Sequence, residues 1–304
     1  MKSREKIGIL IVLWCGIMWG LSGVLGEMLF ENSDVTVGWL ASIRMFVSGC
    51  IILICLFVKQ GKEVFSLWRK KENLIPFFIF TLFGLMAVQY TYFAAVDASN
   101  AATATVLQYT YPVLILLYTA ISTKKIPQIH ETISIFLSFL GVILIATHGN
   151  LSSLSISPIA LFLGLLSAFS FVFYTVYPKK LYEEAGLLQV MAWAFIIGGI
   201  VLFIGTKSYS THISLNAYSL GLTFSITIFG TMIPFVIYGK GVEWLGNVRA
   251  SLFVTVEPIF SAILAVILLN TSFTMIDIVG FICIIGAVEL VAVRTLKESK
   301  KVVI

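Results

Sequence analysis

Long runs of hydrophobic residues alternate with short polar segments along the whole chain. Ten of these runs approach the ~20 residues that an α-helix needs to cross a hydrocarbon core of ~30 Å. The polar segments between them are too short to form a soluble domain. The pattern therefore predicts ten membrane-spanning helices, at about residues 7–28, 37–58, 74–96, 101–122, 130–147, 157–177, 187–205, 217–239, 248–269 and 274–293.

The composition agrees with an integral membrane protein of the all-α class. Hydrophobic residues make up 59% of the 304 residues and charged residues only 12%, whereas about 25% of the residues in soluble domains are charged. The mean hydropathy is +1.01 and the isoelectric point is about 8.9. The basic balance comes from lysines between the hydrophobic runs. We therefore expect a lipid bilayer around the chain and no nucleic-acid partner.

The positive charges predict how the helices are oriented. If the N-terminus is cytoplasmic, 18 of the 20 lysine and arginine residues fall in cytoplasmic segments, and Lys207 alone falls in an outer loop. The remaining one, Arg44, lies inside the second run. Cytoplasmic loops of membrane proteins carry such an excess of positive charge. We therefore predict that both termini are cytoplasmic, in the cell membrane of a bacterium.

The two halves of the chain resemble each other. At a shift of 146 residues and without a gap, F-G-L-M (83–86) matches F-G-T-M (229–232), and Pro112 matches Pro258. A long ungapped register with matched glycine and proline indicates an internal repeat.

The repeat predicts two structural units, residues 1–149 and residues 150–304, with five helices each. Because five is an odd number, the second unit must enter the membrane from the opposite side. Inverted repeats of this kind are typical of secondary transporters, whose substrate sites lie near the bilayer midplane.

Three prolines and one carboxylate lie deep inside the hydrophobic runs: Pro112, Pro234, Pro258 and Glu257. Proline removes a backbone donor and kinks or breaks a helix, so we expect kinks that open a cavity or simple bends that aid packing. Glu257 lies about ten residues from the inner end of its run, roughly 15 Å deep. A charge there is costly and should face the interior. It is therefore expected to bind a substrate amine or a coupling proton, or else to hold helices together.

Other polar and aromatic residues are candidates for the wall of a cavity. Arg44 could hold a substrate carboxylate, form an outer gate or anchor its helix at the interface. For Glu289 we expect a side chain that reaches the inner interface. A cavity with aromatic and amide groups and one carboxylate would suit a small amphiphilic molecule. The remaining candidates are Trp19, Gln89, Tyr90, Gln108, Tyr111 and Tyr174.

No sequence motif indicates catalysis or a bound cofactor. The four cysteines have no metal-ligand spacing, and neither H-E-x-x-H nor G-x-S-x-G is present. A P-loop is also absent. We expect no cofactor, no metal and no enzymatic activity. A multipass membrane enzyme and a channel-type facilitator stay open as alternatives to a transporter, and the oligomeric state stays undetermined.

Several short segments resemble one known family. W-G (19–20), R-M-F (44–46), Y-P-V (111–113) and V-E-P-I-F (256–260) are similar to segments of the EamA-type branch of the drug/metabolite transporter superfamily. Members often have a Gly-Glu pair after the fourth and ninth helices, where this chain has T-K-K-I and L-N-T-S. The resemblance covers essentially the whole chain.

The resemblance implies a central cavity lined by the first, third, fourth, sixth, eighth and ninth helices. It also implies the export or import of amino acids and related metabolites without ATP. Alternating access is expected from the inverted repeat itself, because two similar halves that face opposite ways can exchange conformations. A small-molecule substrate is the partner that the resemblance leads us to expect, and Glu257 leaves a proton open as a coupling ion.

Overall fold

The computed structural model describes residues 2–124, 126–150, 155–245, 250 and 253–301. Every regular element among these residues is a helix. The first half contains α1 (Lys2–Asn32), α2 (Val37–Gln60), η1 (Gly61–Phe65), α3 (Ser66–Arg69), η2 (Lys71–Asn73), α4 (Leu74–Ile79), η3 (Phe80–Met86), α5 (Ala87–Ala98), α6 (Ala101–Gln108), α7 (Tyr111–Thr123) and α8 (Ile129–Thr147). The second half contains α9 (Pro158–Val176), α10 (Lys179–Ala185), α11 (Leu187–Gly205), η4 (Ser208–Ser210), α12 (Ala217–Thr227), η5 (Ile228–Met232), α13 (Ile233–Leu245), α15 (Val256–Leu269) and α16 (Met275–Lys301).

Most of the expected membrane spans are present as helices. Within the described residues, eight helical stretches are long and apolar enough to cross a membrane, and they coincide with the first eight expected runs. The helix α15 is a shorter apolar helix, and α16 is 27 residues long. These two helices occupy the places expected for the last two runs. The start of the run 248–269 lies partly outside the described residues.

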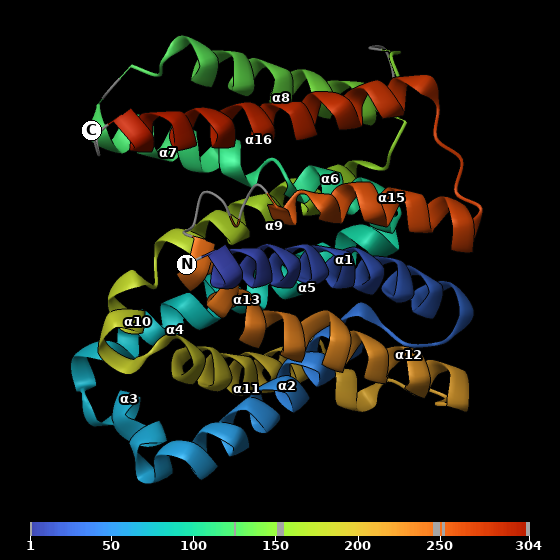
Figure 1. Ribbon diagram of the computed structural model, residues 1–304. Helices are drawn as coiled ribbons and strands as arrows, with labels where there is room; N and C mark the ends of the chain where they lie inside the picture. The colour runs from blue at the N-terminus through green and yellow to red at the C-terminus, as the bar shows by residue number, and fades with distance from the viewer. Residues whose placement is uncertain (1, 125, 151–154, 246–249, 251–252, 302–304) are drawn as a thin grey trace.

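The helices of the two halves pack against one another in matched pairs. The helix α2 packs along α11, and α8 packs along α16. These pairs form opposite sides of the bundle in Figure 1. In the centre, α1 contacts α13 and α15, while α9 contacts α5 and α7. At the shift of 146 residues α13 corresponds to α5 and α15 to α7, so an exchange of the two halves maps the contacts of α1 onto those of α9 and each outer pair onto itself.

Two wide helical turns interrupt the helices at corresponding places. The element η3 joins α4 to α5, and η5 joins α12 to α13, and both are π-helical. At the shift of 146 residues, η3 corresponds to residues 226–232, which contain all of η5. π-Helical turns frequently occur at functional sites. Gly230 in η5 lies directly against Ser22 of α1, so that any side chain there would clash with the serine hydroxyl.

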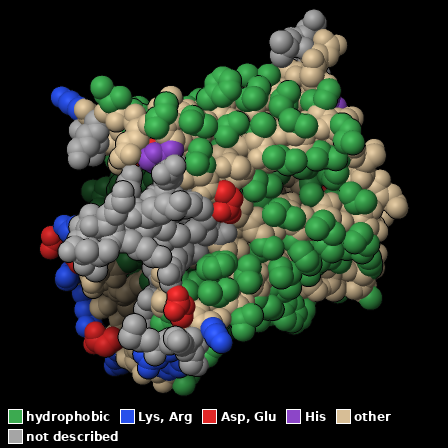
Figure 2. Space-filling model, turned by 45° about the horizontal axis from the view of Figure 1, so that its top comes forward, with side chains coloured by type: hydrophobic (Ala, Val, Ile, Leu, Met, Phe, Trp, Pro, Cys, Tyr) green, Lys and Arg blue, Asp and Glu red, His purple; other side chains and the backbone are tan. Residues whose placement is uncertain are grey.

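The outer surface of the bundle is apolar, as lipid requires. Figure 2 shows a broad hydrophobic face, with lysine and arginine side chains gathered at one end. Large hydrophobic side chains of α8 and α16 are exposed, including Phe136, Phe139 and Ile282. The helix α1 begins and α16 ends at the same end of the bundle (Figure 1).

Candidate functional site

Glu257 lies in the interior, as the cost of a charge in lipid predicts. It is in the first turn of α15 and is 8% exposed. Thr255, immediately before α15, is in a turn, so the helical path is broken at this point. The carboxylate and the break therefore occupy the same place in the bundle.

Tyr109, at the end of α6, contacts both the break and the carboxylate. Its hydroxyl oxygen lies 2.8 Å from the carbonyl oxygen of Val254 and 3.1 Å from Oε2 of Glu257. In an unbroken helix, the carbonyl of residue 254 would accept the N–H of residue 258, and proline has none. The tyrosine of the first half thus replaces the donor that Pro258 removes from the second half.

All three interior prolines begin a new helical segment. Pro112 is the second residue of α7, and Pro258 is the third residue of α15. Pro234 is the second residue of α13 and follows the wide turn η5. A first-turn position tolerates proline because its N–H would have no partner inside the helix. The prolines therefore mark breaks between segments, and the breaks at Pro112 and Pro258 correspond in the repeat.

Two glycines bring α1 against the broken segment. A Cβ atom on Gly16 would lie 3.0 Å from the carbonyl oxygen of Val254, and one on Gly20 would lie 2.9 Å from that of Glu257. The G-x-x-x-G spacing lets helix backbones approach closely. Helix α1 therefore packs directly against the break before α15.

Aromatic side chains form a continuous cluster beside Glu257. The ring centroid of Trp19 lies 5.5 Å from that of Phe235 and 5.2 Å from that of Tyr238. The ring of Tyr174 lies 6.4 Å from that of Phe235. Tyr111 joins Tyr174 through Phe171, with centroid distances of 4.3 and 5.5 Å. The structure thus brings together Trp19, Tyr111 and Tyr174, three of the sequence candidates.

Glu257 is close enough to this cluster for its carboxylate to act electrostatically on the phenols of Tyr111 and Tyr238. The indole Nε1 of Trp19 is buried and has no hydrogen-bond acceptor among the described residues. An acceptor atom of a bound molecule could therefore use this donor without displacing a protein group.

The remaining candidates of the first half, Gln89, Tyr90 and Gln108, contact other parts of the bundle. The Gln108 amide donates to the Ser167 hydroxyl and so links α6 to α9. Gln89 is buried in α5. Tyr90 packs against the hydrophobic cluster that also contacts Tyr174. Among the described residues, none of the three forms a hydrogen bond with Glu257.

Arg44 is buried in the bundle and is 3% exposed. Its Nε donates to the Thr231 hydroxyl at 2.9 Å, and its guanidinium lies 4.5 Å from the ring centroid of Phe93. Its Nη1 is buried and has no acceptor among the described residues. The arginine therefore joins α2 to the wide turn η5 and retains unused donor capacity.

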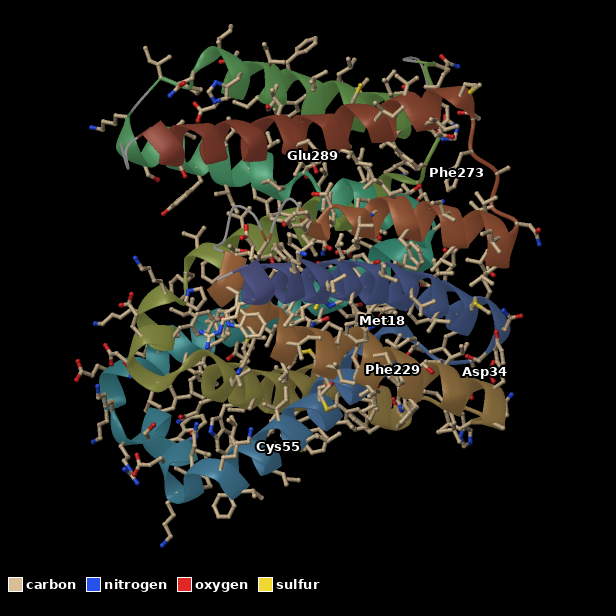
Figure 3. All side chains as sticks on the ribbon, in the orientation of Figure 1. Met18, Asp34, Cys55, Phe229, Phe273 and Glu289 are labelled. Carbon is tan, nitrogen blue, oxygen red and sulfur yellow. The ribbon has the colours of Figure 1, made fainter. Side chains whose placement is uncertain are left out.

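Glu289 lies on α16 (Figure 3). Its carboxylate accepts a hydrogen bond from Thr255, the residue immediately before α15. The break before α15 is therefore contacted by two carboxylates, Glu257 and Glu289.

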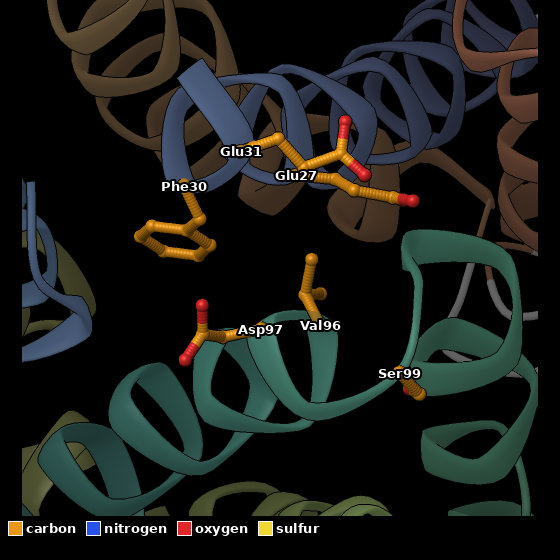
Figure 4. A pocket seen from close by; sticks show the side chains of 6 residues that line it. All are labelled: Glu27, Phe30, Glu31, Val96, Asp97 and Ser99. Carbon is orange, nitrogen blue, oxygen red and sulfur yellow. The ribbon is translucent and has the colours of Figure 1, made fainter. Parts of the chain in front are cut away.

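Two small pockets lie away from Glu257. One has a volume of about 100 Å³ and lies between the C-terminal ends of α1 and α5, where Figure 4 shows Glu27, Glu31 and Asp97 around it. The Glu27 carboxylate accepts the Ala101 N–H at 2.6 Å, at the N-terminus of α6. In the described residues, no group of His, Cys, Asp or Glu is arranged to hold a metal ion.

The second pocket, of about 160 Å³, lies between α1 and the wide turn η5. Its lining is mainly apolar and includes Met18 and Phe229, which Figure 3 labels. The Ser22 hydroxyl borders it and has no partner among the described residues.

Several residues of the site were not among the sequence candidates. Tyr109, Phe171, Thr231, Phe235 and Tyr238 all contact one of the candidates. Tyr238 could have been found as the repeat counterpart of Tyr92, and Tyr109 through its position three residues before Pro112. Nothing local distinguishes Phe235, because it is one of 24 phenylalanines in a hydrophobic chain.

Comparisons with known proteins agree with this architecture. The model of the EamA-like transporter family matches the chain twice, at residues 6–147 and 158–293. The chain is 34% identical to the uncharacterized inner membrane transporter YicL of Salmonella typhimurium, over 99% of each protein. It is 26% identical to the uncharacterized transporter YrdR of Bacillus subtilis, with coverage of 100% of this chain and 96% of the relative.

A solved crystal structure has the same fold. The two chains superpose with a TM-score of 0.66 at 15% sequence identity, over 96% of this chain and 98% of the other. The two family matches, together with the full-length relative, show that this protein belongs to the EamA-like transporter family.

Proposed function

We propose that this protein is a secondary transporter that moves small amphiphilic metabolites, namely amino acids or related compounds, by alternating access and without ATP. The observation that carries the proposal is the buried Glu257, which lies at the break before α15 and contacts Tyr109 of the other half. An ionisable residue at this depth is a functional site by default. Its role is to bind a substrate amine, a coupling proton, or each in turn.

The two halves are proposed to be inverted repeats, residues 1–149 and 150–304, in a bundle of ten membrane-spanning helices. The matched helix pairs and the two corresponding wide turns support this arrangement. Both termini are proposed to be cytoplasmic. The location of lysine and arginine side chains at the end where α1 begins supports this orientation.

The side chains around Glu257 suit an amphiphilic passenger. The rings of Trp19, Phe235 and Tyr238 offer an apolar surface beside the carboxylate. The Nη1 of Arg44, which has no acceptor among the described residues, offers a donor for a carboxylate. A zwitterion with an apolar side chain would use all of these groups, since few convergent polar groups within an apolar lining are the usual pattern of a ligand site.

Counterflow in proteoliposomes tests this function. Purified protein would be reconstituted, loaded with one unlabelled amino acid at a time, and supplied outside with the same labelled compound. Accumulation of label is the expected result. Ion conductance without counterflow would indicate a channel, and a chemically altered compound would indicate an enzyme. Either result would overturn the proposal.

A further inference from the structure

The hydroxyl of Tyr109 faces two acceptors and has one hydrogen to donate. A phenol provides one O–H donor, and its oxygen can also accept. The two partners, the carbonyl oxygen of Val254 at 2.8 Å and Glu257 Oε2 at 3.1 Å, both lie within hydrogen-bond distance. An ionised carboxylate accepts only, and so does a carbonyl. The single hydrogen therefore cannot serve both partners when Glu257 is ionised.

Protonation of Glu257 resolves this competition. The protonated carboxyl group donates its O–H to the Tyr109 oxygen, and Tyr109 donates its own hydrogen to the Val254 carbonyl. Both hydroxyl hydrogens, that of Glu257 and that of Tyr109, then have an acceptor. The backbone carbonyl released by Pro258 is satisfied, and the break before α15 is linked to α6.

When Glu257 loses its proton, the Tyr109 hydrogen changes its acceptor. The carboxylate then attracts the Tyr109 hydrogen, because hydrogen bonds to charged acceptors are about twice as strong as those between neutral groups. The Val254 carbonyl loses its donor in a region without bulk water, which is costly in a membrane. The segment around the break is then favoured to rearrange until the carbonyl finds another donor.

We propose that Tyr109 is a positioning residue that couples protonation of Glu257 to the conformation of the break before α15. The coupling proton passes between water and the Glu257 carboxylate, while Tyr109 keeps its own hydrogen and only turns its hydroxyl. This inference rests on the proposed transport function and supplies its proton linkage. The contact spans the two halves, so the state of one carboxylate affects both.

The titratable side chains that act on Glu257 come from several elements packed around it. Its neighbours with titratable side chains are the phenols of Tyr109, Tyr111, Tyr92 and Tyr238, and phenols are ordinarily neutral at pH 7. From α1, Cys15 faces Tyr238 and donates to the Pro234 carbonyl oxygen.

Three charged residues, Arg44, Glu27 and Glu289, act on neighbours of Glu257 or of the break. Arg44 acts on Tyr92, as does Glu27. From α16, Glu289 accepts from Thr255. Among the described residues, none of these three groups contacts both acceptors, and Tyr109 alone contacts both the Glu257 carboxylate and the Val254 carbonyl.

Infrared difference spectra of the reconstituted protein test the switch without any substrate. The carboxylic-acid band that is missing in Glu257→Gln belongs to Glu257, and the phenol band that is missing in Tyr109→Phe belongs to Tyr109. As the pH rises, the acid band is expected to disappear and the Tyr109 band to shift with the same midpoint. In Glu257→Gln the Tyr109 band should not move. Tyr111→Phe, which removes a neighbouring phenol, is the matched control and should retain both changes.

Hydrogen exchange around residues 253–262 is the second measurement. After correction for intrinsic exchange, protection in the wild type is expected to fall about tenfold when Glu257 ionises, the factor that corresponds to one hydrogen bond. Pro258→Ala restores a backbone donor to Val254 and should abolish this pH-linked difference. It also supplies a test if Tyr109→Phe does not fold.

A Tyr109 band that stays constant while Glu257 titrates would overturn the inference. So would an unchanged pH-linked difference in Pro258→Ala. Because neither measurement uses a transported substrate, a protein that performs counterflow but fails these tests would refute the switch alone. Failure of counterflow would refute the transport function.

Discussion

Arg44 on α2 donates through Nε to the hydroxyl of Thr231, 2.9 Å away in the wide turn η5. The two residues are 187 positions apart in the chain and belong to different halves. The Thr231 hydroxyl in turn donates to the Ile226 carbonyl oxygen at 3.0 Å, five residues earlier, as the π-helical spacing allows. One side chain thus accepts a hydrogen bond from a buried arginine and supports the wide turn.

Thr231→Val is expected to destabilise the protein by about 2 kcal/mol, because it leaves a buried charged donor without its acceptor. The midpoint of thermal unfolding in detergent, followed by tryptophan fluorescence, measures the effect. Thr223→Val is the matched control. The Thr223 hydroxyl is also buried but has no partner among the described residues, so its loss should leave the midpoint unchanged or raise it. Equal effects of the two variants would contradict the role of the Arg44 contact.

Gly20→Ala is expected to weaken the packing of α1 against α15. The added Cβ would lie 2.9 Å from the Glu257 carbonyl oxygen and 3.1 Å from the Ser261 nitrogen, and both are backbone atoms that cannot rotate away. Overpacking of this kind costs about 1–3 kcal/mol. Gly221→Ala in α12 is the control, because nothing lies within 4 Å of its added Cβ. Unfolding midpoints should fall for the first variant only.

Glu257→Gln is expected to lower the initial rate of counterflow at least about tenfold, since the neutral amide forgoes a charge-assisted interaction with the passenger. The dependence of the rate on pH should disappear as well. Glu63→Gln, at an exposed surface pair with Arg69, should transport like the wild type. A Glu257→Gln variant with wild-type rates at every pH would remove Glu257 from the mechanism.

Single-cysteine labelling tests the orientation. In a background without the four native cysteines, Lys62→Cys should react with an impermeant maleimide only in inside-out vesicles, because residues 59–73 are predicted to be cytoplasmic. Lys207→Cys should react only in right-side-out vesicles. Both positions are exposed, so access is limited by the membrane alone. External labelling at position 62 would refute the predicted topology.

The helices and the family could be predicted from the sequence because the signals are local. Each span is a contiguous run of apolar residues, and the first eight expected runs were confirmed as helices long enough to cross a membrane. The resemblance to EamA-type transporters was also confirmed, by a family match that covers both halves. The burial of Glu257 followed from the cost of a charge in lipid alone.

The partners inside the bundle could not be predicted in the same way. In the sequence, Tyr109 is one aromatic residue among many. It is 148 residues away from Glu257 in the chain, and only the fold brings the two side chains into contact. Thr231 likewise had no signal that linked it to Arg44.

The sequence by itself determined that the chain crosses a membrane as helices, that its halves repeat, and that a carboxylate and a proline share one deep position. The tertiary structure alone decided which hydroxyls meet Glu257, Arg44 and the freed Val254 carbonyl. The reason is physical. Hydrocarbon selects each helix by its own length and apolarity, whereas a buried polar group must find its partner wherever packing brings one, because no bulk water is present to supply it.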